Sequence, residues 1–229
     1  MRVDALMPAL NEAACLPGVL DALRLLPLRQ TLVVDNGSTD GTFQIAQAHG
    51  AVALLCSRRG YGSACLHGLA HLRADPPEVV VFLDADGSDD PADLPRLLAP
   101  IERGEAELAI GSRVTGTAEP GALTPVQRFG NALSCLLVRA VWGVRFTDLG
   151  PFRAVTWAAL ERLQMTDPDF GWTVEMQVRA ARLGLRCVEV PVAYRRRRGG
   201  QSKIAGTVRG SFQAGSKILL TIGREALRR

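Results

Sequence analysis

The chain has 229 residues, of which 47% are hydrophobic and 22% charged, with 23 Gly and 13 Pro. These values exclude a disordered or fibrous chain, and the length suits one large domain or one domain with a short appendage. The net charge of +4 is unevenly spread, because residues 193–229 hold ten Lys or Arg and a single acid. We therefore expect this tail to face something anionic: a nucleic acid, a phosphorylated substrate or a membrane leaflet.

The five cysteines form neither a C-x-x-C pair nor a zinc-binding pattern, so we expect buried thiols in a reducing compartment. Asp4 and Pro8 interrupt the apolar stretch that a signal peptide would need. No run of about 18 apolar residues occurs, so no membrane span is expected. The sequence predicts a cytoplasmic protein.

Short apolar segments alternate with helical patterns, which is typical of βαβ units and predicts an α/β fold with a mostly parallel sheet flanked by helices. In the first half, strands are expected at 3–7, 31–34, 52–55, 79–83 and 108–110, with helices near 12–25, 41–49, 63–73 and 91–103. In the second half, we expect a mobile loop at 114–125, a helix at 126–142, a strand at 151–155, a helix at 173–183, a strand at 186–192 and a helix from 207 onward.

Two carboxylates, Asp84 and Asp86, come at the end of the apolar run 79–83. Ligands of open α/β sheets bind beyond the carboxyl ends of the strands, where these residues are expected. Mg²⁺ or Mn²⁺ prefers one or two carboxylates completed by water and by substrate phosphates, such as those of a nucleotide diphosphate. The alternative is an acidic turn in which Asp89 and Asp90 cap the next helix.

A second acidic turn begins at Asp35, after the strand expected at 31–34. Its carboxylate suits a hydrogen bond from a base or a ribose, whereas the alternative is an ordinary turn with Thr39 or Asp40 as helix cap. The Gly60-Tyr-Gly62 segment lacks the third glycine of a dinucleotide motif, so we expect a tight turn that admits a nucleotide.

Basic residues near the expected loops are candidates for phosphate binding. They are Arg113, Arg128 and the cluster 195–203. Arginine forks bind phosphate through two hydrogen bonds, and a lysine adds a mobile point charge, although a solvated charge run is the alternative for the cluster. Nucleic-acid binding is disfavoured, because aromatic residues make up only 5% of the chain and are not interleaved with the cluster.

Nine short motifs, in order along residues 7–203, resemble those of family 2 glycosyltransferases with a GT-A fold, nearest the dolichol-phosphate or polyprenyl-phosphate mannose synthase branch. They are Met7-Pro-Ala-Leu-Asn-Glu12, Val33-Val-Asp-Asn-Gly-Ser-Thr-Asp-Gly-Thr42, Arg59-Gly-Tyr-Gly-Ser-Ala64, Leu83-Asp-Ala-Asp-Gly-Ser-Asp-Asp-Pro91, Gly111-Ser-Arg113, Gln127-Arg-Phe-Gly-Asn131, Asp148-Leu-Gly-Pro-Phe-Arg153, Gly171-Trp-Thr-Val-Glu-Met176 and Gly200-Gln-Ser-Lys203. The resemblance implies a GT-A domain over residues 1–205 and a basic amphipathic helical tail over 206–229.

The resemblance also implies a donor, a UDP- or GDP-sugar, and a metal ion, Mg²⁺ or Mn²⁺. The implied donor-binding residues are Pro8, Ala9, Asn11, Glu12, Asp35, Asn36, Gly60, Asp84, Ala85 and Asp86. The metal would be held by Asp84 and Asp86, with Ser88 as a weaker third ligand, since the lipid-phosphate enzymes often carry Gln at that position.

For the acceptor, the resemblance implies a phosphorylated polyprenyl lipid and inverting transfer of the sugar. The residues implied in catalysis are Asp86, Arg113, Arg128, Arg197 and Lys203. An ionised phosphate is already a nucleophile, so no strong general base is needed. Glu175 is a possible base for a hydroxyl acceptor, and its alternative is pairing with Arg179 one helical turn later.

Two further expectations, with their alternatives, follow for the acceptor and the tail. The segment from Arg197 to Lys203 is expected to become ordered when diphosphate binds, because Gly199-Gly200 gives it freedom to close. The helices at 126–142 and 207–229 mix apolar and basic residues, which predicts peripheral binding to an anionic membrane surface at the inner face of the cell membrane. The alternatives are that both helices pack on the protein or form a homodimer, that the acceptor is a soluble hydroxyl compound or small metabolite, or that the chain is a non-catalytic membrane-surface binder.

Overall fold

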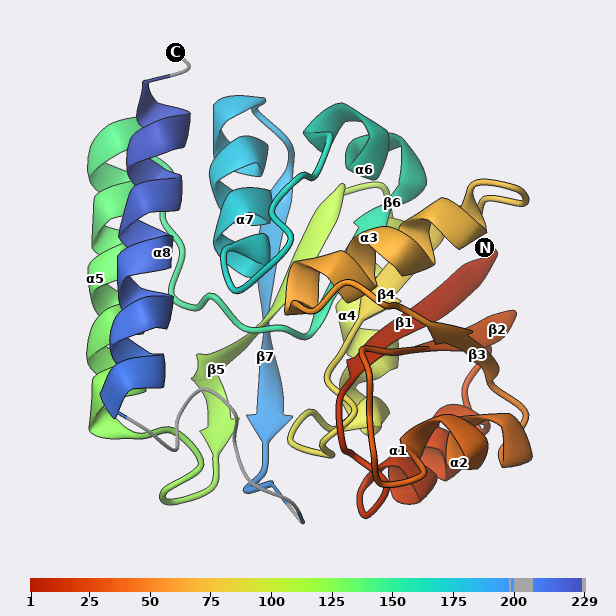
Figure 1. Cartoon of the computed structure of the whole chain (residues 1–229). Helices are drawn as coiled ribbons and strands as arrows, with labels where there is room; N and C mark the ends of the chain where they lie inside the picture. Colours follow the sequence, from red (N-terminus) through yellow and green to blue (C-terminus); the bar gives the residue numbers. More distant parts are fainter. Residues whose placement is uncertain (198, 200–207, 228–229) are drawn as a thin grey trace.

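The fold comes from a computed structural model that describes residues 1–197, 199 and 208–227, with side chains described except at 208–216. Lys203 and most of the segment expected to order around diphosphate lie outside the described residues. Seven strands form one sheet in the order β3-β2-β1-β4-β6-β5-β7 (Figure 1). The strands are β1 (Val3–Ala9), β2 (Gln30–Asp35), β3 (Val52–Leu55), β4 (Val79–Phe82), β5 (Leu108–Ala118), β6 (Arg153–Thr156) and β7 (Cys187–Tyr194).

Only β6 runs antiparallel to its neighbours, β4 and β5, and the other four pairings in the sheet are parallel. The carboxyl ends of β1, β2 and β4 therefore meet at one edge of the sheet, where the sequence carries its acidic turns. The predicted α/β class with a mostly parallel sheet is confirmed.

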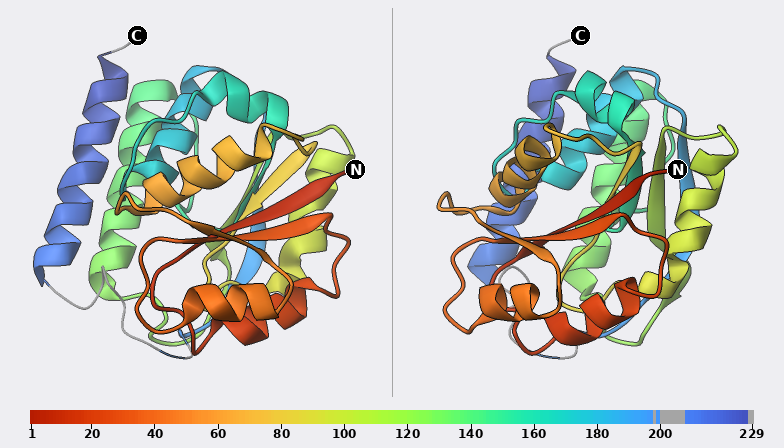
Figure 2. Two further views of the ribbon diagram at one scale, coloured as in Figure 1. Left: turned by 45° about the vertical axis from the view of Figure 1, so that its right-hand side comes forward. Right: turned by 90° about the vertical axis from the view of Figure 1, so that its right-hand side faces the viewer.

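Helices cover both faces of the sheet (Figure 2). One face carries α1 (Leu16–Leu23), α2 (Thr42–Ala48) and α4 (Leu94–Glu102), with a short 3-10 helix, η1 (Pro91–Asp93), before α4. The other face carries α3 (Tyr61–Leu72), α5 (Pro125–Trp142), α6 (Trp157–Leu163), α7 (Trp172–Arg182) and α8 (Val208–Ala226). The two layers are held by two hydrophobic cores, because side chains alternate along each strand: Leu6 of β1 enters the α3 side, while Ala5 and Met7 enter the α1 side.

Two elements differ from the sequence prediction. The region expected as a mobile loop from residue 114 begins as strand, since β5 continues to Ala118 and pairs with β7 beyond an irregularity between Ser112 and Thr117. Helix α6 was not expected, and it begins at the cap residue Thr156, whose side chain accepts a hydrogen bond from the Ala159 N–H (3.3 Å). At the predicted start of the fourth helix, Asp90 accepts from the Ala92 N–H (3.2 Å) and caps the 3-10 helix η1, while α4 itself begins three residues later, at Leu94.

The C-terminal helix α8 lies side by side with α5 and α7 (Figures 1 and 2). Ile222 is buried and Ile218 packs against the core. Both are apolar residues of the helix at 207–229, which was predicted to lie on a membrane surface. They face the protein instead, so the prediction is wrong for these two residues. None of the helices in the described part of the chain is long and apolar enough to cross a bilayer.

Candidate active site

A tight acidic turn follows the buried strand β4. The Asp86 carboxylate accepts a hydrogen bond from the Ser88 N–H (2.9 Å), and the Asp89 carboxylate accepts from the Asp84 N–H (3.2 Å). Gly87 has φ +73°, a left-handed conformation that lets the chain reverse here. The turn therefore collects three carboxylates within six residues at the carboxyl end of a central strand.

The electrostatics of this turn favour a bound cation. Burial raises the pKa of the Asp84 carboxyl well above its usual range, and the neighbouring charges of Asp86 and Asp89 raise it further. Burial also raises the pKa of Asp89 to about 7. One oxygen of Asp89 is buried without a hydrogen-bond partner among the described residues. Carboxylate oxygens are the donors that Mg²⁺ and Mn²⁺ prefer, so the residues fit such an ion.

The protein supplies only part of a metal shell at this turn. Within the described residues, no group of three or more His, Cys, Asp or Glu side chains is arranged as a complete metal site. Ser88, expected as a third ligand, is buried, and its backbone bonds to Asp86 and to the Arg195 N–H (2.8 Å). An ion held by two carboxylates would take its other ligands from water and from phosphate oxygens of a substrate.

Tyr61 adds to the candidate site a side chain that is not among the site residues predicted from the sequence. It is the first residue of α3, and its hydroxyl donates a hydrogen bond to Asp84 Oδ1 (3.1 Å). Burial raises the pKa of the Tyr61 phenol well above its usual value, so the hydroxyl keeps its proton and remains a donor. A hydrogen bond of this kind orients a metal-binding carboxylate. The only signal in the sequence was the position of Tyr61 between two glycines.

Asp35 stands at the end of β2 with its two carboxylate oxygens in different roles. Oδ1 accepts hydrogen bonds from the Gly37 N–H (2.8 Å) and the Ser38 N–H (2.7 Å). Oδ2 is buried and has no partner among the residues that the structure describes. Asp40 instead serves the start of α2, where it accepts from the Thr42 N–H (3.1 Å). One acceptor of Asp35 is therefore left unsatisfied by the described part of the protein.

Other residues predicted to bind the sugar donor connect the ends of neighbouring strands. Asn36 accepts from the Gly60 N–H (2.7 Å) and donates to the Arg58 carbonyl (2.7 Å), so it joins β2 to the start of α3. Asn11 has φ +53° and accepts from the Thr39 N–H (2.8 Å). Pro8, Ala9 and Ala85 are at the strand ends beside them, with Ala9 and Ala85 buried. These hydrogen bonds hold the loops that follow β1 and β2 and the start of α3 together.

Arg197 joins three of the segments that sequence reasoning assigned to the site. Its guanidinium bonds to the Glu12 carboxylate after β1 and lies 3.8 Å from Asp86 Oδ2 after β4. Burial lowers the pKa of Arg197, but the hydrogen bond with Glu12 and the charges of Glu12 and Asp86 together raise it above its usual value, so the side chain stays cationic. Arg195, on the same segment, forms an ion pair with Asp90. The structure thus brings Glu12, Asp86 and Arg197 together.

Arg113 and Arg128, both predicted to hold phosphate, lie in contrasting environments. Arg113 forms two hydrogen bonds to the buried Asp148 carboxylate (2.8 and 2.7 Å), and its guanidinium lies 5.0 Å from the centre of the Tyr194 ring. Arg128 is exposed on α5 and forms no ion pair with any residue that the structure describes. Arg113 is thus held by the protein, whereas Arg128 presents its charge to solvent.

The two glycines around Tyr61 serve packing. A Cβ added at Gly60 would lie 2.2 Å from the Pro168 carbonyl oxygen, and one added at Gly62 would lie 2.0 Å from the Asp167 carbonyl oxygen. The sequence predicted a tight turn that admits a nucleotide, but the close approach observed here is that of the chain segment at 167–168. Gly60 still lines the strand-end region through its hydrogen bond to Asn36.

Glu175, considered as a base, is buried in α7. It pairs with Arg179 (2.7 Å) and accepts hydrogen bonds from the Thr166 hydroxyl (2.6 Å) and the Asp167 N–H (2.8 Å). The alternative interpretation, a partner for Arg179 one turn later, is confirmed.

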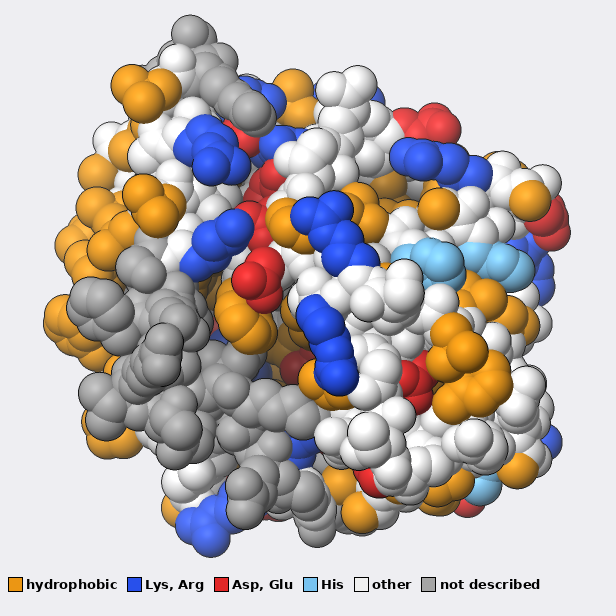
Figure 3. All heavy atoms as spheres, viewed as in Figure 1, with side chains coloured by type: hydrophobic (Ala, Val, Ile, Leu, Met, Phe, Trp, Pro, Cys, Tyr) orange, Lys and Arg blue, Asp and Glu red, His pale blue; other side chains and the backbone are white. Residues whose placement is uncertain are grey.

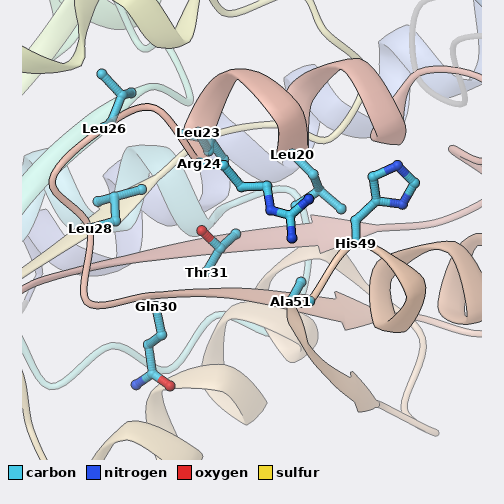
Figure 4. Close-up of a pocket in the computed structure, with 10 residues that line it drawn as sticks. Leu20, Leu23, Arg24, Leu26, Leu28, Gln30, Thr31, His49 and Ala51 are labelled. Atoms are coloured by element: carbon cyan, nitrogen blue, oxygen red, sulfur yellow. The ribbon is translucent and has the colours of Figure 1, made fainter.

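A cavity of about 220 Å³ lies elsewhere, at the amino ends of β2 and β3 (Figure 4). Leu23, Arg24, Gln30 and His49 are among the residues that line it, and none of the predicted site residues does. Because ligands of open α/β sheets bind beyond the carboxyl ends of the strands, this cavity is separate from the candidate site.

These features together define a GT-A-like α/β protein with a candidate ligand site at its strand ends. Residues 4–162 match Glycosyl transferase family 2, and the chain belongs to that family. It is 40% identical to an uncharacterized glycosyltransferase of Mycobacterium tuberculosis, with 93% of this chain and 94% of that protein covered. It is 34% identical to the undecaprenyl-phosphate mannosyltransferase of Micrococcus luteus, with 92% and 90% covered.

A solved structure gives the same fold. Glucosyl-3-phosphoglycerate synthase from Mycobacterium tuberculosis, in complex with Mn²⁺, UDP-glucose and phosphoglyceric acid, matches with a TM-score of 0.77 and 26% identity, covering 97% of this chain and 80% of that one. The chain is thus a nucleotide-sugar glycosyltransferase.

Proposed function

We propose that the chain transfers a sugar from a UDP- or GDP-sugar to a phosphorylated polyprenyl lipid, with inversion and with dependence on Mg²⁺ or Mn²⁺. The observation that carries the proposal is the turn after β4, where Asp84 and Asp86 are crowded with Asp89 at a strand end. Asp84 and Asp86 would hold the metal, which when bound neutralises the negative charge that develops on the leaving diphosphate.

The donor is held by the chain's own residues around that turn. The unpaired oxygen of Asp35 accepts a hydrogen bond from the base, and the segment containing Asn11 and Glu12 closes the same side. Tyr61 keeps the Asp84 carboxylate oriented. Arg197 lies between Glu12 and Asp86, so it supplies positive charge beside the diphosphate.

The reaction needs no protein base when the acceptor is a phosphate. A phosphate oxygen of the acceptor attacks the anomeric carbon, the bond from that carbon to the diphosphate oxygen breaks, and the nucleotide diphosphate leaves with both electrons. This agrees with Glu175, whose carboxylate is committed to Arg179 and to backbone donors. Arg128, exposed on α5, and Lys203 are proposed to hold the acceptor phosphate, and Arg113 to support the site from its pair with Asp148.

The relative in Micrococcus luteus, named for an undecaprenyl-phosphate acceptor, supports the lipid acceptor. A second candidate is a soluble phosphorylated acceptor, favoured by the structural match to a synthase crystallised with phosphoglyceric acid. Both candidates share an anionic phosphate as the group that the cations must recognise.

Peripheral membrane binding is part of the lipid-acceptor proposal. Val126, Phe129 and Leu136 of α5 are 60%, 71% and 59% exposed, and Leu219 and Leu220 of α8 are also exposed. Figure 3 shows hydrophobic side chains gathered on the side of the molecule that α5 and α8 form. We propose that this side meets anionic lipid at the inner face of the cell membrane, while Arg128 and Arg139 add charge.

The experiment that tests the function combines metal removal, one substitution and an acceptor panel. Transfer from UDP- and GDP-sugars to polyprenyl phosphate is measured with Mn²⁺ or Mg²⁺, with EDTA, and for Asp86→Ala. We expect EDTA and Asp86→Ala each to reduce transfer at least about 100-fold, as loss of a metal would. The exposed Glu105→Gln is the control and keeps the parental rate.

Transfer by Asp86→Ala at the parental rate, or no effect of EDTA, contradicts the metal assignment. Transfer to 3-phosphoglycerate in place of polyprenyl phosphate contradicts the lipid acceptor and selects the soluble one.

A further inference from the structure

The segment at 164–171, between α6 and α7, contacts α8 through a buried carboxylate. Asp167 has a side chain only 5% exposed, and its Oδ2 lies 3.3 Å from the Lys217 ammonium of α8. A Cβ added at Gly171 would lie 2.4 Å from this Oδ2 and 2.9 Å from the Thr221 hydroxyl. The carboxylate is thus enclosed between the start of α7 and α8, and its counter-charge comes from α8.

The backbone of the same segment contacts the first turn of α3. The Pro168 carbonyl accepts hydrogen bonds from the Ser63 N–H (2.8 Å) and the Ser63 hydroxyl (3.0 Å). The Asp167 and Pro168 carbonyls fill the space in which side chains at Gly62 and Gly60 would lie. No room is left for this segment to move toward α3, so its position fixes that of the first turn.

Tyr61 lies in that turn, between the two glycines. Its hydroxyl reaches Asp84 Oδ1 at 3.1 Å, so a displacement of the turn by 1 Å would lengthen or break the hydrogen bond. A series of contacts therefore runs from Lys217 through Asp167 and Pro168 to Ser63, in the turn that carries Tyr61, and the Tyr61 hydroxyl links that turn to Asp84.

A second set of ion pairs fixes α8 to the same segment. Glu225 of α8 is buried and pairs with Arg179 and Arg182 of α7, each at 3.1 Å. Arg179 also pairs with Glu175, whose carboxylate accepts from the Asp167 N–H. Lys217 at the middle of α8 and Glu225 near its end are thus tied, directly or through α7, to the segment that supports Tyr61.

We propose that Lys217 and Asp167 are positioning residues of the metal and donor site, acting through Tyr61 on the orientation of Asp84. The inference rests on the proposed metal-dependent function and deepens it. It makes the packing of α8, a helix far from the carboxylates in the sequence, a determinant of metal affinity.

The first test measures Mn²⁺ affinity in buffer without nucleotide or lipid, by electron paramagnetic resonance of the free ion. Lys217→Met is expected to weaken binding about 3- to 10-fold, less than the 10- to 100-fold loss typical when a group bonded to a metal ligand is removed. The matched control is Arg224→Met, which removes the same charge from a residue of α8 with no ion pair in the described part of the chain, and should bind as the parent does. Lys217→Arg keeps the positive charge and should bind Mn²⁺ as the parent does.

The second test distinguishes positioning from a general loss of stability. Tyr61→Phe and Lys217→Met should not be additive, because once the phenol is gone the lysine has nothing left to position. In the metal-free protein, hydrogen exchange at the Ser63 amide should be about 10-fold faster in Lys217→Met than in the parent. If Lys217→Met does not fold, Asp167→Asn takes its place, since it keeps the acceptor for the Asp169 N–H.

Additive effects in the double variant, or unchanged exchange at Ser63, overturn the inference. If the parent protein binds no Mn²⁺, the proposed function fails, and the exchange comparison, which needs no metal, alone decides whether Lys217 holds the first turn of α3.

Discussion

Asp35 engages one carboxylate oxygen within the protein and leaves the other buried without a partner among the described residues. Asp35→Asn would keep an acceptor for the Gly37 and Ser38 N–H groups and place an N–H₂ donor where the unpaired oxygen stands. A base N–H would then face a donor, and losing a hydrogen bond to a charged group costs about 1.5–3 kcal/mol. We expect UDP or GDP to bind about 10- to 150-fold more weakly, as measured by calorimetric titration with Mn²⁺ present.

The control for this substitution is Asp21→Asn, an exposed carboxylate on α1, which should leave nucleotide affinity unchanged. Parental affinity in Asp35→Asn would show that the unpaired oxygen does not meet the nucleotide.

At the residue level, the sequence predicted positions better than partners. The strand-end location of Asp35, Asp84 and Asp86 followed from the apolar runs that precede them. The commitment of Arg113 to Asp148 did not, because the two residues are 35 positions apart and only the fold brings them to 2.7 Å. Tyr61 was missed for the same reason, since its function depends on Asp84, which is 23 positions away.

At the level of elements, the two glycines at the start of α3 set how closely the segment at 167–168 can approach. Gly62→Ala would place a Cβ 2.0 Å from the Asp167 carbonyl oxygen, so either the helix or the segment must shift. Such overpacking lowers the free energy of unfolding by about 1–3 kcal/mol. We therefore expect a lower melting temperature together with weaker Mn²⁺ binding.

Gly18→Ala in α1 is the matched control, because a Cβ there meets nothing within 4 Å. It should raise the free energy of unfolding by about 0.5–1 kcal/mol, the usual gain from Ala over Gly within a helix. A Gly62→Ala protein as stable as the parent would contradict the close contact.

Element boundaries were predictable where local chemistry marks them and not where distant pairing decides. Thr124 and Gln127 form a capping box that starts α5 close to its predicted position. The Gly- and Thr-rich end of β5 has no strand pattern of its own, and it is extended because Thr117 and Ala118 pair with β7. Helix α6 was missed because its seven residues are too few to display a clear period.

For the whole molecule, the exposed apolar residues on α5 give the membrane proposal its test. The double substitution of Phe129 and Leu136 by Glu adds charge at positions that are already exposed, so the fold should be kept. We expect the parent to float with vesicles containing anionic lipid and the double variant to lose most of that binding, since each buried apolar side chain contributes about 1.5–3 kcal/mol.

Leu25→Glu is the control, because Leu25 is 87% exposed and follows α1 on the other face of the sheet. It should float as the parent does. A parent protein that is active but does not float with anionic vesicles at low salt contradicts the membrane proposal and favours the soluble acceptor.

The layer arrangement was predictable from the alternation of strands and helices, but the position of α8 was not. Its basic and apolar residues suggested a helix lying on lipid, whereas Ile222 and Glu225 are buried against the protein. Glu225 is buried and paired with Arg179 and Arg182. This could be predicted only by knowing which helix lies opposite α8, and the amphipathic pattern of α8 alone does not contain that information.

The position of β6 between β4 and β5 has a consequence for synthesis of the chain. β4 has β1 on one side, but its other neighbour begins only at Arg153, about 70 residues after β4 ends. During translation at about 5–20 residues per second, β4 would stay an open edge for several seconds after it emerges. An unpaired strand edge is a template for pairing with other chains. Nascent chains that stall before Arg153 should therefore aggregate, whereas chains released after Tyr194 have every strand of the sheet.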